Sequence, residues 1–182
     1  MKVVEASDLE RIDDMAGDHP HITKPTENQE DREYFLLKDG EDIVGCGYIR
    51  VFLEKLGNIG SVFIVEDRRG DGAGTFFVGE LEDRLEEKGV SLCIIGVHSG
   101  NKSAKKFWEK TGYHVLVQSI GDDVFESETF RKVLQVVSPK PVPENGVTIM
   151  GKRFGSSDDE NTHPLKELYD LKDFVGSLET GF

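Results

Sequence analysis

The chain has 182 residues, of which 37% are hydrophobic and 31% charged, and its formal net charge is −13 at pH 7. The length suits one domain with a self-sufficient apolar core, no apolar run reaches the roughly 18 residues of a membrane-spanning helix, and no N-terminal apolar stretch resembles a signal peptide. Because the negative charge disfavours nucleic acid and anionic membranes as partners, we expect a cytoplasmic protein that binds neither.

The N-terminal part of the chain predicts an antiparallel meander preceded by one short helix. Ser7 can cap that helix, which carries Leu9, Ile12 and Met15 at helical spacing. The dipeptide Asp39-Gly40 is a hairpin signal between two strand-like runs. The predicted strands cover residues 1–6, 34–37, 43–52 and 56–65.

The second half of the chain alternates helices and strands. Phe77, Leu81 and Leu85 recur every four residues among charges, which predicts an amphipathic helix that ends near Gly89. The apolar run over residues 90–98 is typical of a central strand. The further predicted elements are helices over residues 101–111, 126–137 and 164–175 and strands over residues 113–120 and 147–154. This order predicts a mixed α/β fold around one sheet.

The cysteines and histidines indicate neither a disulfide nor a metal site. Cys46 and Cys93 lie far apart in apolar runs, which predicts two buried thiols rather than a disulfide. His19 and His21 have no partners at metal-ligand spacing, so no metal site is expected.

A glycine-rich turn between a strand and a helix is the sharpest chemical signal. Gly70, Gly72 and Gly74 permit positive φ angles and let the backbone approach a ligand closely. Successive N–H groups at a helix start attract anions, and Arg69 could add a charge. The turn therefore predicts a phosphate or diphosphate cradle, although a turn needed only for packing stays open. The Gly-Lys-Ser/Thr of a P-loop is absent, and the preceding hairpins do not suit a Rossmann fold.

Two blocks resemble the GNAT superfamily of N-acetyltransferases. Residues 64–74, IVEDRRGDGAG, are similar to its acetyl-CoA signature, an apolar strand end followed by Arg/Gln-x-x-Gly-x-Gly/Ala, with Glu66 in place of the usual proline. Residues 101–113, NKSAKKFWEKTGY, resemble its second block, which begins with asparagine. The resemblance covers residues 1–154 and implies a mostly antiparallel central sheet flanked by helices. Residues 155–182, an acidic linker and an amphipathic helix, have no counterpart; the helix could cover the core, swap onto a partner or dock in a homodimer.

The resemblance implies acetyl-CoA as co-substrate and assigns residues to it. The pantetheine arm would pair with the backbone of a strand end, where an N–H near Ile64 would polarise the thioester oxygen. Asn101 would contact that arm or would simply cap its own helix, and both interpretations stay open. The implied coenzyme-binding residues are Val62, Phe63, Ile64, Arg69, Gly70, Asp71, Gly72, Ala73, Gly74, Thr75 and Asn101.

The family's usual catalytic positions hold unsuitable side chains in this sequence. Trp108 occupies the position of the general acid, while Gly96 and Asn58 occupy two positions of the base, and none of them exchanges a proton usefully. His98 shares a strand face with Gly96 and is the candidate base. Tyr113 is the candidate acid, with Ser103 as another weak substitute.

The resemblance implies transfer of an acetyl group to a primary amine of a small molecule or protein, by direct attack on the thioester. The net charge and an acidic patch are consistent with a cationic acceptor, while solubility or life in high salt is the alternative explanation of the charge. The alternative is a non-catalytic acyl-CoA sensor or interaction module, suggested by the unsuitable catalytic positions. An unrelated nucleotide-phosphate binder is a third interpretation. The patch comprises Asp122, Asp123, Glu126 and Glu128.

Overall fold

The computed structural model describes residues 1–7, 10, 12, 31–52, 55–120 and 146–155. The chain divides into two compact units, Met1–Cys93 and Ile94–Phe182. Within the described residues, no helix is long and apolar enough to cross a membrane. The helices predicted near residue 8 and over residues 126–137 and 164–175, and the acidic patch, lie outside the described residues.

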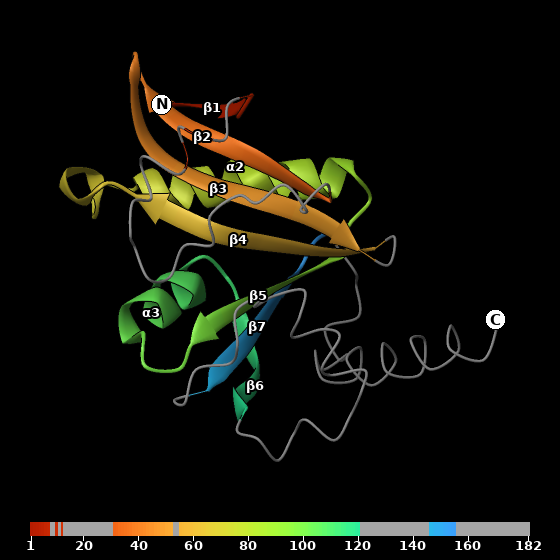
Figure 1. Ribbon diagram of the computed structural model, residues 1–182. Coiled ribbons are helices and arrows are strands. Elements are labelled where there is room, and N and C mark those ends of the chain that lie inside the picture. The colour runs from red at the N-terminus through yellow and green to blue at the C-terminus, as the bar shows by residue number, and fades with distance from the viewer. Residues whose placement is uncertain (8–9, 11, 13–30, 53–54, 121–145, 156–182) are drawn as a thin grey trace. The chain divides into compact units, whose positions relative to one another are not determined.

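Four antiparallel strands form the sheet of the first unit (Figure 1). Each strand pairs with the next along the chain, as the predicted meander requires. The pair Asp39–Asp42 closes a two-residue turn in which Gly40 has a φ of 62°, so the predicted hairpin is confirmed. The strands are β1 (Lys2–Glu5), β2 (Arg32–Asp39), β3 (Asp42–Phe52) and β4 (Leu56–Ile64).

Helix α2 (Ala73–Glu87) lies against β3 and β4 (Figure 1). Phe77, Leu81 and Leu85 are fully buried, which confirms the predicted apolar face. Burial of each such side chain contributes about 1.5–3 kcal/mol. The helix ends where Gly89 takes a φ of 82°, a conformation that favours glycine.

A second cluster of buried side chains gathers around β2 and β3 in the first unit. Its aromatic centre is the pair Tyr34 and Tyr48, whose ring centroids lie 5.6 Å apart. Cys46 belongs to this cluster, and burial raises the pKa of its thiol to about 12. Cys46 and Cys93 are both buried thiols, as predicted, and Cys46 remains a protonated packing residue.

Strand β5 (Leu92–His98) begins in the first unit, where Leu92 and Cys93 pair in parallel with β4, and it continues in the second unit. Helix α3 (Lys102–Lys110), β6 (His114–Ile120) and β7 (Val147–Arg153) follow. The hydrogen-bonded strand order is β1-β2-β3-β4-β5-β7-β6. The predicted mixed α/β, mostly antiparallel fold is therefore confirmed.

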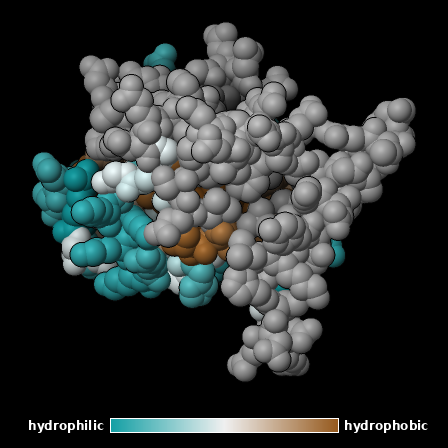
Figure 2. Space-filling model, turned by 90° about the horizontal axis from the view of Figure 1, so that it is seen from below, coloured by the Kyte–Doolittle hydropathy of each residue, from teal (hydrophilic) through white to brown (hydrophobic). Residues whose placement is uncertain are grey.

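Helix α3 is polar outside and aromatic inside. Its exposed residues are charged or polar. Among the coloured residues of Figure 2, hydrophilic ones cover more of the visible surface than hydrophobic ones. On its inner side Trp108 is buried, and its ring centroid lies 4.9 Å from that of Tyr113. Gly112, at a φ of 94°, closes the helix as predicted.

Gly60 in β4 offers a test of sheet packing close to the site described below. A Cβ at Gly60 would lie 2.3 Å from ring atoms of the buried Tyr48. We expect Gly60→Ala to lower the free energy of unfolding by about 1–3 kcal/mol, because the buried ring must move. The measurement is urea denaturation.

The matched control is Gly79→Ala in α2, where a Cβ would meet nothing within 4 Å. That variant should raise the free energy of unfolding by about 0.5–1 kcal/mol, since alanine suits a helix better than glycine. Equal stability of the two variants would contradict the packing at Gly60.

Candidate coenzyme site

A β-bulge interrupts β4 near its carboxyl end. Between the register pairs Cys46–Phe63 and Tyr48–Gly60, β4 carries one residue more than β3. Within this bulge Ser61 has a φ of 50°, the only positive value at a non-glycine residue in the described part of the chain. Bulges bend a strand and change the direction of its backbone groups, and they recur beside functional sites.

Strand β4 pairs in parallel with β5 near its amino-terminal end. Leu56 pairs with Leu92 and Gly57 pairs with Cys93, and β4 continues as far as Ile64. An extended ligand can add to such a strand by backbone hydrogen bonds, as a further strand would. The predicted pantetheine-binding residues, Val62 to Ile64, lie on this part of β4, and Val62 and Phe63 are partly exposed.

The glycine-rich turn joins β4 to α2 through a short 3-10 helix, η1 (Glu66–Arg68). Gly70 and Gly72 have φ angles of 89° and 94°, and a Cβ at either would meet nothing within 4 Å. Glycine is therefore required for the backbone angles and not for space. The first helical hydrogen bond of α2 runs from the N–H of Phe76 to the carbonyl of Gly72.

The turn presents donors for an anion at the positive end of a helix dipole. Gly70, Gly72 and Thr75 are exposed, and Gly74 is half-buried. Within the described residues, no hydrogen bond to the backbone N–H groups of these four residues was found. N–H groups of this kind bind phosphate oxygens in many proteins.

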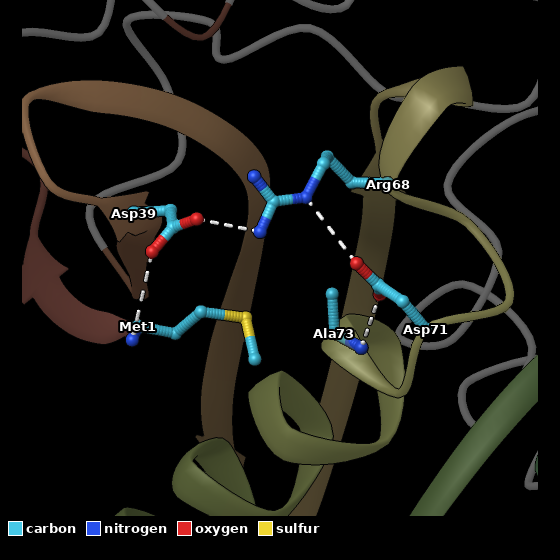
Figure 3. Close-up of polar contacts among 5 residues, drawn as sticks. All are labelled: Met1, Asp39, Arg68, Asp71 and Ala73. Atoms are coloured by element: carbon cyan, nitrogen blue, oxygen red, sulfur yellow. Dashed lines mark hydrogen bonds and ion pairs between the residues drawn. The ribbon is translucent and has the colours of Figure 1, made fainter.

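The carboxylate of Asp71 accepts a hydrogen bond from one N–H group of the same turn, that of Ala73 (Figure 3). Its Oδ1 atom accepts that N–H at 3.0 Å, and its Oδ2 atom accepts from Arg68 Nε at 3.2 Å. The hydrogen bond from Ala73, assisted by Arg68, holds the pKa of the Asp71 carboxyl below its usual range. Hence Asp71 stays ionised, and its contacts weaken only when the pH falls through that lowered pKa.

Arg69 turns back toward the end of β4. Its Nε atom donates to the carbonyl of Ile64 at 2.8 Å, and its guanidinium lies 5.4 Å from the ring centroid of Phe63. The side chain therefore braces the strand end from which the turn departs, while 47% of its surface stays exposed.

In the second unit, Asn101 caps α3. Its Oδ1 atom accepts the N–H of Ala104 at 3.0 Å. The capping contact, one of the two interpretations that the sequence left open, is therefore present in the structure. The N–H of Asn101 also donates to the carbonyl of His98 at 2.8 Å. Asn101 thus orders the turn that carries His98.

His98 is half-buried at the last position of β5. The following residue is fixed to the neighbouring β7 region, because Ser99 donates its N–H to the carbonyl of Gly146 at 3.1 Å and its hydroxyl lies 3.3 Å from that of Thr148. Gly96 is half-buried and Val97 is buried, as expected if Gly96 and His98 share a face.

The other sequence-selected residues lie in packed positions. Tyr113 is fully buried against Trp108, with Lys152 Nζ 5.9 Å from its ring centroid. In the first unit, Asn58 is only 1% exposed and donates from Nδ2 to the carbonyl of Ile59 at 3.3 Å. Within the described residues, no group of three or more His, Cys, Asp and Glu side chains could hold a metal ion.

Sequence reasoning missed two features of the site. The bulge at Ser61 has no local sequence signal, because it arises from pairing with β3. The Asp71 contact does have one, since aspartate often accepts a backbone N–H two residues later in turns.

Known proteins resemble this chain in sequence and in fold. The sequence model of the acetyltransferase (GNAT) family matches residues 5–113, more than half of the chain. An uncharacterised N-acetyltransferase of Chlorobaculum tepidum is 28% identical over 116 residues, which cover 62% of this chain and 71% of that protein.

Two solved structures share the fold at low sequence identity. A Mycobacterium tuberculosis protein in complex with CoA has a TM-score of 0.62 and 17% identity, covering 85% of this chain and all of that one. An Elizabethkingia anophelis GNAT acetyltransferase with acetyl-CoA bound has a TM-score of 0.58 and 14% identity, covering 84% of this chain and 97% of that one.

The capping role of Asn101 predicts an effect on stability in the absence of coenzyme. We expect Asn101→Ala to lower the free energy of unfolding by about 1 kcal/mol, because the N–H of Ala104 loses its acceptor. Asn101→Asp, which keeps an acceptor, should retain most of the stability. Thermal unfolding measures both variants; an Asn101→Ala protein as stable as the original would contradict the cap.

Proposed function

The chain belongs to the acetyltransferase (GNAT) family, and on that premise we propose that it transfers an acetyl group from acetyl-CoA to a primary amine. The assignment of acetyl-CoA as the acetyl donor rests on the turn before α2. Its exposed N–H groups and the helix dipole favour a diphosphate without the need for a metal ion.

The proposed placement of the coenzyme follows the backbone of the first unit. The diphosphate would bind over residues 69–75, and the pantetheine arm would add along Val62 to Ile64, at the carboxyl end of β4. The bulge at Ser61 supports this placement, because it turns the backbone of β4 immediately before those residues. A backbone N–H near Ile64 would then polarise the thioester oxygen.

The proposed reaction is a direct displacement at the thioester. The neutral amine nitrogen attacks the carbonyl carbon, a C–N bond forms and the C–S bond breaks. The nitrogen loses one proton and the departing sulfur gains one, so the products are an N-acetyl amide and free CoA.

We assign the proton leaving the amine to His98. Imidazole accepts protons near neutral pH, and the backbone of the turn after His98 is fixed by Asn101, Ser99 and their partners. Tyr113 is a weaker candidate for the acid, because its side chain is fully buried. The acceptor would be a small molecule or a protein amine, and the net charge of −13 favours a cationic one.

A substitution in the glycine-rich turn gives the first test of coenzyme binding. Gly72→Ala should weaken CoA binding by about tenfold, since a side chain at this φ strains the turn and shifts its N–H groups. The matched control is Gly89→Ala, which meets an equally positive φ at the other end of α2.

Both substitutions should lower the free energy of unfolding by about 1–2 kcal/mol. Only Gly72→Ala should change the dissociation constant for CoA measured by isothermal titration calorimetry. If the two variants bound CoA equally well, the turn would not be the diphosphate site.

Catalysis is tested by thiol release from acetyl-CoA with a panel of amines that includes small cationic amines, antibiotic amines and peptides. We expect release with at least one amine, and His98→Gln should lower kcat by about 100-fold. Tyr113→Phe, which keeps the buried ring, should lower kcat less.

A panel without any thiol release, from a protein that still binds CoA, would favour the non-catalytic sensor. A His98→Gln variant with unchanged kcat would instead remove His98 from the reaction and leave the activity standing.

A further inference from the structure

The turn before α2 already holds an anion that belongs to the chain. The carboxylate of Asp71 accepts the N–H of Ala73 at 3.0 Å, inside the same set of donors that we assign to the diphosphate (Figure 3). Asp71 is exposed to solvent, whereas Ala73 is fully buried, so a diphosphate that used the N–H of Ala73 would have to take the place of the carboxylate. Two anions cannot both use this single donor at full strength.

The charge of Asp71 is only partly compensated. Arg68 donates to Asp71 through Nε at 3.2 Å, but it donates to Asp39 through Nη2 at 2.5 Å. One guanidinium therefore serves two carboxylates, and its shorter contact is with Asp39. The amino group of Met1 lies 3.8 Å from the other oxygen of Asp39, too far for a hydrogen bond (Figure 3).

We propose that Asp71 lowers the affinity of this protein for CoA, because its carboxylate occupies the N–H of Ala73 and must release it when the diphosphate binds. The inference rests on the proposed coenzyme site. Arg68 then acts as a positioning residue, since it offers the released carboxylate a partner beside the turn.

A second role of Asp71 opposes the first, and this opposition makes the inference testable. In the free protein the bond to Ala73 satisfies one of the unpaired N–H groups at the start of α2, so it stabilises the fold. Removal of the carboxylate should therefore destabilise the free protein and strengthen coenzyme binding at once. A residue that only shaped the turn would change both quantities in the same direction.

The experiment measures the dissociation constant for CoA by calorimetry and the melting temperature of the free protein. Asp71→Ala removes both the acceptor and the charge, and we expect about fivefold tighter CoA binding together with a lower melting temperature. Asp71→Asn keeps an acceptor but removes the charge, so it should bind CoA about twofold to threefold more tightly and melt close to the original protein.

The matched control is Asp67→Asn, which removes an exposed charge from the neighbouring η1. Its dissociation constant should stay within about 1.5-fold of the original, because this carboxylate has no described contact with the turn. Equal gains from Asp67→Asn and Asp71→Asn would overturn the inference by attributing the effect to net charge.

CoA binding by the original protein and by Asp71→Ala distinguishes a wrong role for Asp71 from a wrong coenzyme site. If the original protein binds CoA and Asp71→Ala binds it equally or more weakly, Asp71 organises the site and the inference is wrong while the coenzyme site stands. If the original protein binds no CoA, the proposed site and the inference both fail.

Discussion

The site depends on one backbone constraint: the chain must leave β4 and enter α2 through two residues with positive φ. Gly70 and Gly72 meet this requirement because they lack a Cβ. The resulting path leaves Gly70, Gly72 and Thr75 exposed around the start of a helix, where the dipole adds positive potential. A turn with ordinary φ angles would direct those groups elsewhere, and the strand–helix pair would lose its attraction for anions.

Packing on both sides of the turn holds that constraint in place. On one side, Phe77, Leu81 and Leu85 bury the face of α2 against the sheet. Gly47 and Gly57 let the helix approach closely, since a Cβ on either would lie 3.2 Å or less from Phe77 or Leu85. On the other, Arg69 ties the turn to the carbonyl of Ile64. The geometry of the site is therefore a consequence of the core and not of the turn alone.

The sequence predicted local features well and long-range features poorly. The face of α2, the hairpin at Gly40 and the glycine turn were predictable because each depends on residues close together in the chain. The bulge at Ser61 was not, since it results from the register between β3 and β4. Similarly, no local pattern could show that Arg69 turns back to β4. The glycine spacing predicts an anion site, which stays a prediction, and it did not indicate that Asp71 would contact the N–H of Ala73.

The distribution of charge explains how a chain with a net charge of −13 can suit a polyanionic ligand. The two arginines beside the turn are engaged by the protein, Arg68 with two carboxylates and Arg69 with a carbonyl and an aromatic ring. Attraction must therefore come mainly from neutral N–H dipoles, whose field is strong only within the first turn of the helix. If the turn binds the coenzyme as we propose, we expect it to select a ligand that reaches the backbone, because the surrounding field repels anions that remain at a distance. A resident carboxylate at Ala73 is consistent with this arrangement, since the dipoles bind whichever anion is close enough to touch them.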